Sequence, residues 1–206
     1  MPDGIKPYYY DSKYEIAIFW GDCLDIMPQL EPVDFILADP PYLEGDKSES
    51  IFPMFSLTKK IVIFPGKYEV FNWINRKVPQ YQYAWKCSGT RSRGGRACLH
   101  ILFEPILAYE YPLRPLGSDL LDYPLVVDPL ANGHPWPKPR RLFSKIVLHW
   151  SNPNETILDP FMGSGTTLVA AKELGRKCIG IEIEERYCEI AARRLSQDCF
   201  QWRKND

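Results

Sequence analysis

The chain has 206 residues, a length typical of one domain or of one domain with a small appendage, and long enough to bury a sizeable core. Hydrophobic residues make up 45% and charged residues 25%, and 25 basic residues face 26 acidic ones, for a net charge of -1. This balance excludes a histone-like or polybasic protein, although a local basic patch would still allow nucleic acid as a partner.

Short apolar runs that end in turn residues predict strands along most of the chain. In chain order they span residues 15–20, 33–38, 60–64, 82–87, 98–103, 155–158 and 177–183. The fourth and fifth runs flank a loop rich in Gly, Arg and Ser and are predicted to form a hairpin. Eight of the 19 prolines fall between Pro105 and Pro139, so the middle of the chain is expected to be rich in loops.

Two helices are predicted near the C-terminus. Residues 166–174 stop just before Gly175, a common helix stop signal. Residues 184–195 begin with acidic and end with basic side chains, which suits the helix dipole, and their apolar residues fall on one face. Strands that alternate with helices predict an α/β fold with a mostly parallel sheet, in which ligands bind at the carboxyl ends of the strands.

No segment reaches the ~20 apolar residues of a membrane span, and the N-terminus lacks the pattern of a signal peptide. None of the six cysteines forms a Cys-x-x-Cys pair, which argues against zinc ribbons and redox dithiols and favours buried cysteines. We therefore expect a cytoplasmic protein with reduced cysteines and no membrane partner.

Residues 157–175 (ILDPFMGSGTTLVAAKELG) read as a strand, a glycine-rich turn and a helix. Gly163 and Gly165 allow a sharp turn and the close approach of a ligand. Glu182 follows 17 residues after Gly165, near the end of the next strand, where a carboxylate can accept both hydroxyls of a ribose. The pattern predicts a nucleoside-binding unit, with a tight turn that binds nothing as the alternative.

The details of this turn oppose NAD as the ligand. The dinucleotide fingerprint has a third small residue where this chain has Leu168. Asp159 stands at the turn and suits a cation better than a pyrophosphate. S-adenosylmethionine fits, because it combines a ribose and an adenine with a positively charged sulfonium and an amino group.

Residues 34–42 (DFILADPPY) end a buried strand in an acid, two prolines and an aromatic residue. Pro40 and Pro41 make the turn rigid, so the Asp39 carboxylate and the Pro40 carbonyl become two fixed acceptors. Such a pair suits the exocyclic amine of a nucleobase, because it stabilises the positive charge that develops as a methyl group arrives. The base would leave the duplex and stack on Tyr42. An acidic surface turn is the alternative.

Together, the DPPY and DPFMGSGTT motifs resemble the amino-methylating DNA methyltransferases, in the motif order of the permuted beta class. The resemblance implies a single domain over residues 1–206 with the Rossmann-like class I fold, a circularly permuted, mostly parallel sheet of seven strands. The C-terminal strands 155–158 and 177–183 would then lie beside the N-terminal strand 15–20, as domain termini that are close in space allow. S-adenosylmethionine as cofactor, DNA as partner, a restriction–modification context and no metal follow from the same resemblance.

The resemblance also implies the site residues. The catalytic set is Asp39, Pro40, Pro41 and Tyr42. The cofactor set contains an acid near the adenine, two residues of the GHPWPKP segment near the methionine end, the glycine-rich turn and the ribose acid: Asp22, His134, Lys138, Asp159, Pro160, Phe161, Gly163, Ser164, Gly165, Thr166 and Glu182. Residues 103–110 (FEPILAYE) resemble the segment that closes the base pocket.

Between residues 110 and 133 the chain has only about two dozen residues, where the family usually carries a long target-recognition region. We expect a short loop region here, with recognition that is minimal or supplied by a second subunit, either in a homodimer or from a separate recognition chain. Two basic groups are candidates for phosphate contacts, with a solvated hairpin tip as the alternative for the first: Lys86, Arg91, Arg93 and Arg96, and Arg140 and Arg141. Trp85, His100 and His149 are expected to be structural.

The sequence thus predicts a methyltransferase acting on an exocyclic amine in DNA. Asp39, in place of the Ser of the other motif form, favours adenine N6 over cytosine N4. Three alternatives remain open: methylation of cytosine N4, RNA as the substrate, and a non-catalytic subunit that keeps the fold and binds DNA or a partner chain.

Overall fold

The computed structural model describes residues 5–41, 53–86, 103–124 and 138–197. These residues form one nine-stranded sheet in the order β1-β2-β9-β8-β3-β4-β6-β5-β7. The strands are β1 (Tyr9–Asp11), β2 (Ile16–Trp20), β3 (Phe35–Ala38), β4 (Ile61–Ile63), β5 (Tyr81–Lys86), β6 (Phe103–Ala108), β7 (Leu120–Asp122), β8 (Thr156–Asp159) and β9 (Lys177–Glu182).

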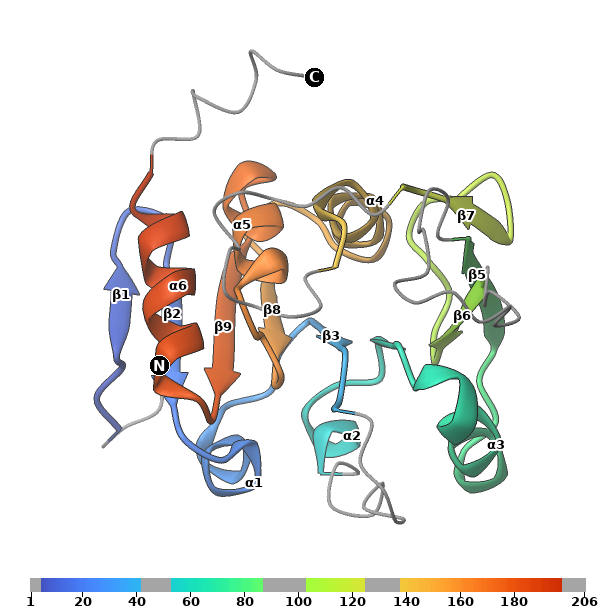
Figure 1. Ribbon diagram of the computed structural model, residues 1–206, viewed down its shortest axis with the longest axis horizontal. Coiled ribbons are helices and arrows are strands. Elements are labelled where there is room, and N and C mark those ends of the chain that lie inside the picture. Colours follow the sequence, from blue (N-terminus) through green and yellow to red (C-terminus); the bar gives the residue numbers. More distant parts are fainter. Residues whose placement is uncertain (1–4, 42–52, 87–102, 125–137, 198–206) are drawn as a thin grey trace, which may run out of the picture.

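Helices cover both faces of the sheet. They are α1 (Cys23–Ile26), the 3₁₀ helix η1 (Met27–Gln29), α2 (Met54–Leu57), α3 (Gly66–Arg76), α4 (Arg140–Trp150), α5 (Thr166–Glu173) and α6 (Glu185–Leu195). One hydrophobic cluster joins one side of the sheet to α4, α5 and α6, and a second joins the other side to α1, α2 and α3. In Figure 1, α1, α2 and α3 lie along the lower side of the molecule and α4 and α5 along the upper side, as expected for a three-layer α/β fold.

The two ends of the chain meet in the sheet. β2 pairs in parallel with β9, from Ile16 opposite Cys178 to Trp20 opposite Glu182, and β9 pairs in parallel with β8. The prediction that the C-terminal strands lie beside the N-terminal strand is therefore confirmed. On its other side β8 pairs with β3, so four parallel strands from both ends of the chain end at one edge.

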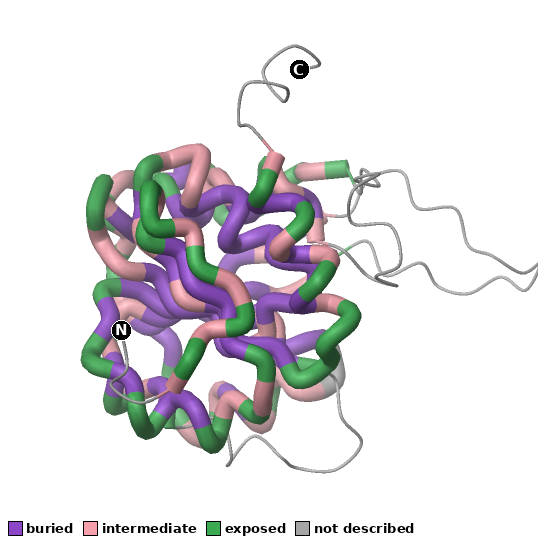
Figure 2. Tube along the Cα trace, turned by 90° about the vertical axis from the view of Figure 1, so that its left-hand side faces the viewer, coloured by how far each residue is buried: buried purple, intermediate pink, exposed green. Residues whose placement is uncertain are grey.

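The central strands are buried on both faces. β3 (FILA) and β4 (IVI) contain only buried residues, as do the first four positions of β2 (IAIF). Parallel strands covered by helices on both sides read as continuous apolar runs of this kind. Figure 2 shows the result, a buried centre with exposed residues around it.

The predicted hairpin exists, but its second strand is later in the chain than expected. β5 pairs antiparallel with β6, with Tyr83 opposite Ile106. β6 begins at Phe103, where the expected strand 98–103 was to end, and residues 98–102 lie outside the described part. Pro105 is tolerated inside β6 because β4 pairs with β6 only at Leu107 and Ala108, so no hydrogen bond from position 105 toward β4 is needed.

Within the described residues the sheet has nine strands rather than the seven expected. The two additional strands, β1 and β7, have three residues each and lie at the two edges. β7 falls in the segment 110–133, which was expected to be a loop, and buries Leu121 while leaving Leu120 and Asp122 exposed. A strand this short gives little periodicity in the sequence, which explains why it was missed.

Both predicted C-terminal helices are confirmed. α5 ends before Gly175, which adopts a left-handed conformation at φ 70°, and α6 begins one residue later than predicted. Trp85 and His149 are buried as expected, and the His149 ring bonds the Arg114 carbonyl oxygen at 2.8 Å. Among the described residues, no helix is both long enough and apolar enough to cross a membrane.

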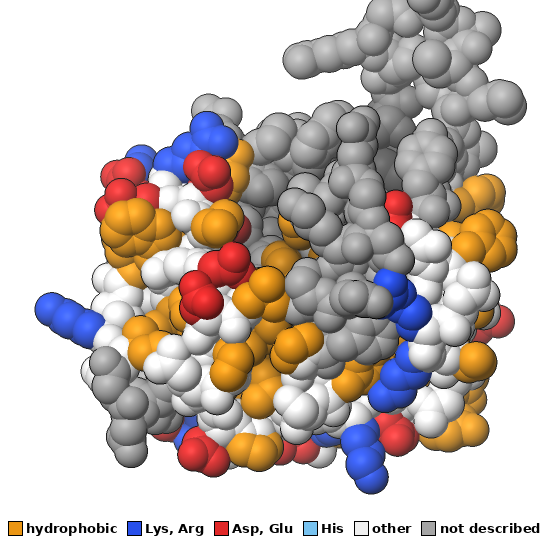
Figure 3. Space-filling model, turned by 90° about the horizontal axis from the view of Figure 1, so that it is seen from below, with side chains coloured by type: hydrophobic (Ala, Val, Ile, Leu, Met, Phe, Trp, Pro, Cys, Tyr) orange, Lys and Arg blue, Asp and Glu red, His pale blue; other side chains and the backbone are white. Residues whose placement is uncertain are grey.

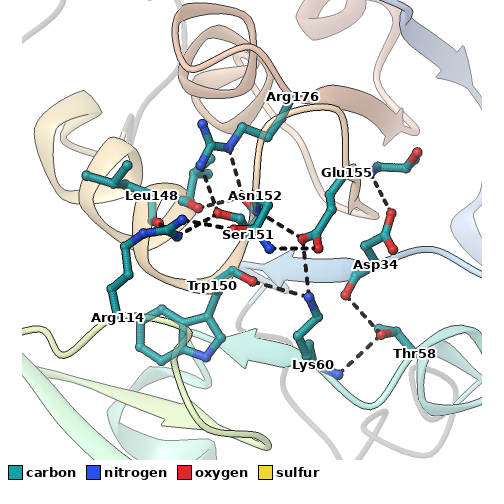
Figure 4. Close-up of polar contacts among 12 residues, drawn as sticks. Asp34, Thr58, Lys60, Arg114, Leu148, Trp150, Ser151, Asn152, Glu155 and Arg176 are labelled. Carbon is teal, nitrogen blue, oxygen red and sulfur yellow. Dashed lines mark hydrogen bonds and ion pairs between the residues drawn. The ribbon is translucent and has the colours of Figure 1, made fainter.

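A polar network fixes the C-terminus of α4 at the edge of the sheet where the parallel strands begin (Figure 4). The Arg114 guanidinium donates to the carbonyl oxygens of Leu148 (2.8 Å) and Ser151 (3.1 Å) and to Oδ1 of Asn152 (2.8 Å). Arg176, just before β9, donates to the Ser151 carbonyl (2.8 Å) and to its hydroxyl (3.1 Å). The two arginines satisfy carbonyl groups that a helix end leaves without partners.

The same network extends to the strands that begin beside it. Lys60, just before β4, forms an ion pair with Glu155 at 3.2 Å. Asp34, just before β3, accepts a hydrogen bond from the backbone N–H of Thr156 at 2.8 Å. The starts of β3, β4, β8 and β9 therefore each have a polar contact, and α4 is tied to the sheet through Arg114 and Arg176.

We expect Arg176→Met to lower the free energy of unfolding by about 2–4 kcal/mol, because the Leu174 carbonyl and the buried Ser151 hydroxyl each lose a charged donor and the Ser151 carbonyl keeps only Arg114. Urea denaturation measures this change. The neighbouring Lys177→Met is the matched control, since Lys177 forms a half-exposed ion pair with Glu15 and should cost less than about 1 kcal/mol. Equal losses in the two variants would contradict an anchoring role for Arg176.

Candidate functional site

Four acidic residues gather at the carboxyl ends of the parallel strands. Asp22 follows β2, Asp39 follows β3, Asp159 ends β8 and Glu182 ends β9. The strand register aligns these ends, with Asp159 opposite Gly180 and Trp20 opposite Glu182. In Figure 1 the strands β8 and β9 point to the lower side of the molecule, and Figure 3 shows acidic and hydrophobic side chains next to one another on that side.

The glycine-rich turn after β8 is held by side chains around it. Oδ1 of Asp159 accepts the N–H of Phe161 at 3.0 Å, and its Oδ2 accepts the Thr167 hydroxyl at 2.5 Å. The N–H of Gly163 donates to Oε2 of Glu182 at 2.9 Å. Gly165 has φ 80°, and a Cβ at this position would lie 2.7 Å from Cβ of Ala191. Glycine is therefore required at position 165 both by the backbone conformation and by the close approach of α6.

Asp159 carries the strongest electrostatic perturbation at this edge. Its side chain is almost completely buried, and burial raises the pKa of Asp159 to about 7. The negative charges of Asp39 and Glu182 contribute to this rise, and hydrogen bonds from Thr167 and Phe161 oppose it; the value of about 7 includes all of these effects. Within the described part of the chain, no lysine or arginine forms an ion pair with Asp159. A positively charged ligand bound here would compensate the negative charge of the Asp159 carboxylate.

Glu182 both shapes the turn and keeps acceptor capacity. Its Oε1 accepts the N–H of Glu184 at 2.8 Å, and its Oε2 accepts the N–H of Gly163. Burial raises the pKa of Glu182, against the effect of these backbone donors. A carboxylate has about four acceptor positions, so Glu182 can still accept from a ligand hydroxyl in addition to its backbone donors. The expected ribose contact is therefore compatible with the structural role that Glu182 already has.

Asp22 lies beside Glu182 at the start of α1. It is exposed, and its Oδ1 caps the helix by accepting the N–H of Leu24 at 2.9 Å. The N–H of Gly21 donates to the Glu182 carbonyl at 2.9 Å, which fixes the distance between the two chain segments. Trp20 donates from its indole to the Ile183 carbonyl at 3.0 Å, and both side chains leave apolar surface exposed at this end of β2 and β9.

Lys138 lies between two acids, Asp39 after β3 and Glu104 in β6. Its Nζ is 3.0 Å from Oδ1 of Asp39 and 2.5 Å from Oε1 of Glu104, and it sits over the rings of Phe64 (5.2 Å) and Trp85 (5.7 Å). Burial alone would lower the pKa of Lys138, but Asp39 and Glu104 outweigh burial and raise it. The ammonium therefore stays charged. The resemblance placed Lys138 near the cofactor's methionine end. Its described contacts are instead with Asp39, which follows β3, and with Glu104 in β6.

The remaining predicted residues divide into described and undescribed ones. Pro40 is buried and Pro41 exposed after β3. Lys86 forms an ion pair with Asp122 at 2.8 Å, and Arg140 forms one with Glu173, so both candidate phosphate contacts are engaged by carboxylates. Arg141 is exposed on α4. The predictions for Tyr42, Arg91, Arg93, Arg96, His100 and His134 lie outside the described residues.

Sequence reasoning missed two side chains that shape the site. Glu104 pairs with Lys138, and Arg194 on α6 is buried and donates to the turn at Ser164. Arg194 was read as part of the basic end of an amphipathic helix. The sequence did contain a sign of this. Arg194 lies three residues after Ala191, so both fall on the helix face that packs inward.

We expect the stability of the ligand-free protein to fall as pH rises toward 8, because ionised Asp159 is disfavoured by burial in the folded state. A carboxyl pKa raised from 3.8 to about 7 corresponds to roughly 4 kcal/mol, present below pH ~4 and lost as pH rises through 7. Asp159→Asn removes this titration while keeping the shape. The variant should match the parent within about 1 kcal/mol at pH 4 and exceed it at pH 8 in urea denaturation. Parallel pH profiles would contradict the buried charge.

Comparison with known proteins supports one family. Residues 55–193 match the family model described as DNA methylase (N6_N4_Mtase). YubD of Escherichia coli strain K12, which is named as a methylase, is 31% identical over 211 residues, covering 85% of this chain and 88% of that protein. The type II methyltransferase M2.DpnII of Streptococcus pneumoniae is 47% identical over 72 residues, which cover 35% of this chain and 27% of that protein.

Solved structures agree with this result. The complex of M1.HpyAVI with SAM is 28% identical to this chain, with a TM-score of 0.73, and the match covers 87% of this chain and 98% of that one. The PvuII cytosine-N4-specific methyltransferase is 17% identical with a TM-score of 0.76 over 95% of this chain and 91% of that one, which shows a shared fold. The predicted Rossmann-like class I fold is confirmed. Since the family model spans more than half of the chain and YubD aligns over most of both proteins, the chain belongs to the N6/N4 family of DNA methylases.

Proposed function

We propose that this DNA methylase transfers the methyl group of S-adenosylmethionine to the N6 amine of adenine in DNA. The observation that carries the proposal is the pairing of β3 with β8, which places the Asp39 turn next to the Asp159 turn. One turn presents acceptors for an amine, and the other presents a buried negative charge for the donor. The two halves of a methyl transfer reaction therefore share one edge of the sheet.

The cofactor half is supported by the chemistry of its residues. S-adenosylmethionine supplies an electrophilic methyl group when bound, and M1.HpyAVI was solved in complex with it. Buried Asp159 suits the positive amino group and sulfonium, Glu182 the ribose hydroxyls and Asp22 the adenine side. The other residues of the proposed cofactor set belong to the glycine-rich turn and to the GHPWPKP segment: His134, Lys138, Pro160, Phe161, Gly163, Ser164, Gly165 and Thr166.

The acceptor half consists of the Asp39 carboxylate and the Pro40 carbonyl, with Pro41 holding the turn rigid and Tyr42 as the stacking platform. The target amine donates its two N–H groups to these acceptors, which directs the nitrogen lone pair at the methyl carbon. As the new C–N bond forms, the electron pair of the breaking C–S bond returns to the leaving sulfur, and the positive charge that develops on the nitrogen is stabilised by Asp39. The nitrogen then loses one of its protons to water, which gives the neutral methylated amine. Lys138 pairs with the Asp39 carboxylate at 3.0 Å and so helps to hold it in place.

The choice of adenine over cytosine rests on the aspartate at position 39. The family includes N6 and N4 enzymes, and the PvuII structure that shares this fold is cytosine-specific. The DPPY form of the motif favours the N6 acceptor by resemblance. Methylation of cytosine N4 is the second candidate.

The permuted beta-class order is proposed from the motif order and from the position of β2 beside β9. By the same proposal, residues 110–133 replace a full recognition domain. Recognition of the target DNA sequence then depends on few contacts or on a partner subunit. Arg141, exposed on α4, and the basic residues near 91–96 would contact phosphates. A companion restriction enzyme would complete a restriction–modification system.

We expect Asp39→Ala to reduce methyl transfer by at least ~100-fold, because one of the two amine acceptors is lost. The dissociation constant for S-adenosylmethionine should stay within about threefold of the parent value, since the cofactor half is intact. Tritiated methyl incorporation into DNA and calorimetric titration measure the two quantities. Glu31→Ala, at an exposed acid between α1 and β3, is the control and should leave both unchanged. Retained turnover in Asp39→Ala would remove this mechanism.

The product identifies the target base. DNA of mixed sequence is incubated with the protein and S-adenosylmethionine, digested to nucleosides and analysed by mass spectrometry, with RNA as a parallel substrate. N6-methyl-2′-deoxyadenosine from DNA, with no methylated nucleoside from RNA, supports the proposal. N4-methyl-2′-deoxycytidine from DNA, or methylated nucleosides from RNA only, would replace it with the corresponding alternative. No product from either polymer, despite cofactor binding, would favour a non-catalytic subunit.

A further inference from the structure

Arg194 places a buried guanidinium behind the glycine-rich turn. It stands in the last turn of α6 and is 4% exposed. Its Nη1 donates to the carbonyl oxygen of Ser164 and lies 3.2 Å from the Ser164 hydroxyl and 3.5 Å from the Thr166 hydroxyl. A buried guanidinium is tolerated only where hydrogen bonds compensate for its lost hydration. Three of the contacts of Nη1 are with Ser164 and Thr166 of the turn.

A second contact from α6 reaches the same turn. Ala191, three residues before Arg194, packs so closely on Gly165 that a Cβ there would be 2.7 Å away. On the opposite side, Glu182 of β9 accepts the N–H of Gly163. The turn is therefore clamped at three successive residues, by β9 at 163 and by α6 at 164 and 165.

We propose that Arg194 is a positioning residue that holds the Ser164–Thr166 backbone in the shape the cofactor requires. The inference rests on the proposed role of this turn in binding S-adenosylmethionine. Arg194 acts through the turn from behind. Its loss frees the Ser164 carbonyl and the start of α5 to move, which weakens cofactor affinity more than it slows the chemical step.

The test compares Arg194→Met and Arg194→Lys with Arg193→Met on the same helix. Arg193 is exposed and pairs with Glu189 at 2.9 Å, so its variant keeps the turn intact. Calorimetric titration with S-adenosylmethionine gives the dissociation constant. We expect R194M to raise it about tenfold or more, R194K to raise it by a smaller factor because one charged donor remains, and R193M to leave it unchanged.

A loss of stability alone must be distinguished from a positioning effect. Leu121→Ala removes a buried side chain from β7, far from β9 in the strand order, and should lower the melting temperature without changing cofactor affinity. In steady state, R194M should raise KM for the cofactor while kcat at saturation stays within about threefold.

A folded R194M with the parent dissociation constant would overturn the proposal, as would an equal rise in KM for L121A. If R194M does not fold, R194K decides the matter, because parent-like cofactor binding by R194K would also refute it. The titration involves no DNA. A parent protein that binds S-adenosylmethionine but methylates nothing would therefore refute the proposed activity while leaving the role of Arg194 intact.

Discussion

The parallel pairing of β3 with β8 is the constraint on which the site depends. It brings the acid that follows one strand, Asp39, next to the acid that ends the other, Asp159, although 120 residues separate them. Carboxylates packed this closely and away from water repel one another, which contributes to the raised pKa of Asp159. A positively charged group beside these acids would relieve the repulsion, so the local loss of stability would contribute to the binding of a cation.

The order of segments along the chain matters less than their order in the sheet. β2 comes first in the chain among the strands of the site, yet its neighbour is β9, which comes last. Pairing of buried apolar strands depends on their surfaces and on the helices that cover them, and a connection can be moved where the ends are near each other. The turn after β8, which contains Asp159, and the turn after β3, which contains Asp39, meet at one edge for this reason. Their order along the chain does not affect this.

Much of this arrangement could be predicted, because β2, β3 and β8 are short, mostly apolar runs closed by Gly, Asp or Pro. α4 was missed although its residues Leu142, Phe143, Ile146, Val147 and Trp150 form a helical stripe, since its aliphatic and aromatic composition is equally common in strands. The ion pair of Lys138 with Asp39 and Glu104 could not be predicted from spacing. Its members come from three segments whose distance in space is set by the whole sheet, and short-range patterns carry no information about such contacts.

The two edges of the parallel sheet differ in how their charges are matched. Where the strands begin, Lys60 pairs with Glu155, and the arginines at 114 and 176 bind carbonyl groups of α4, so the polar groups there are compensated and the helix is fixed. Where the strands end, acids outnumber the described cations in contact with them, and Asp159 is buried without an ion pair among the described residues. At the edge with matched charges, the polar groups stabilise the fold and are already engaged with one another. The unmatched edge is less stable alone, and it is there that the proposed function places the acceptors for a cationic donor and an amine, at Asp159, Glu182 and Asp39.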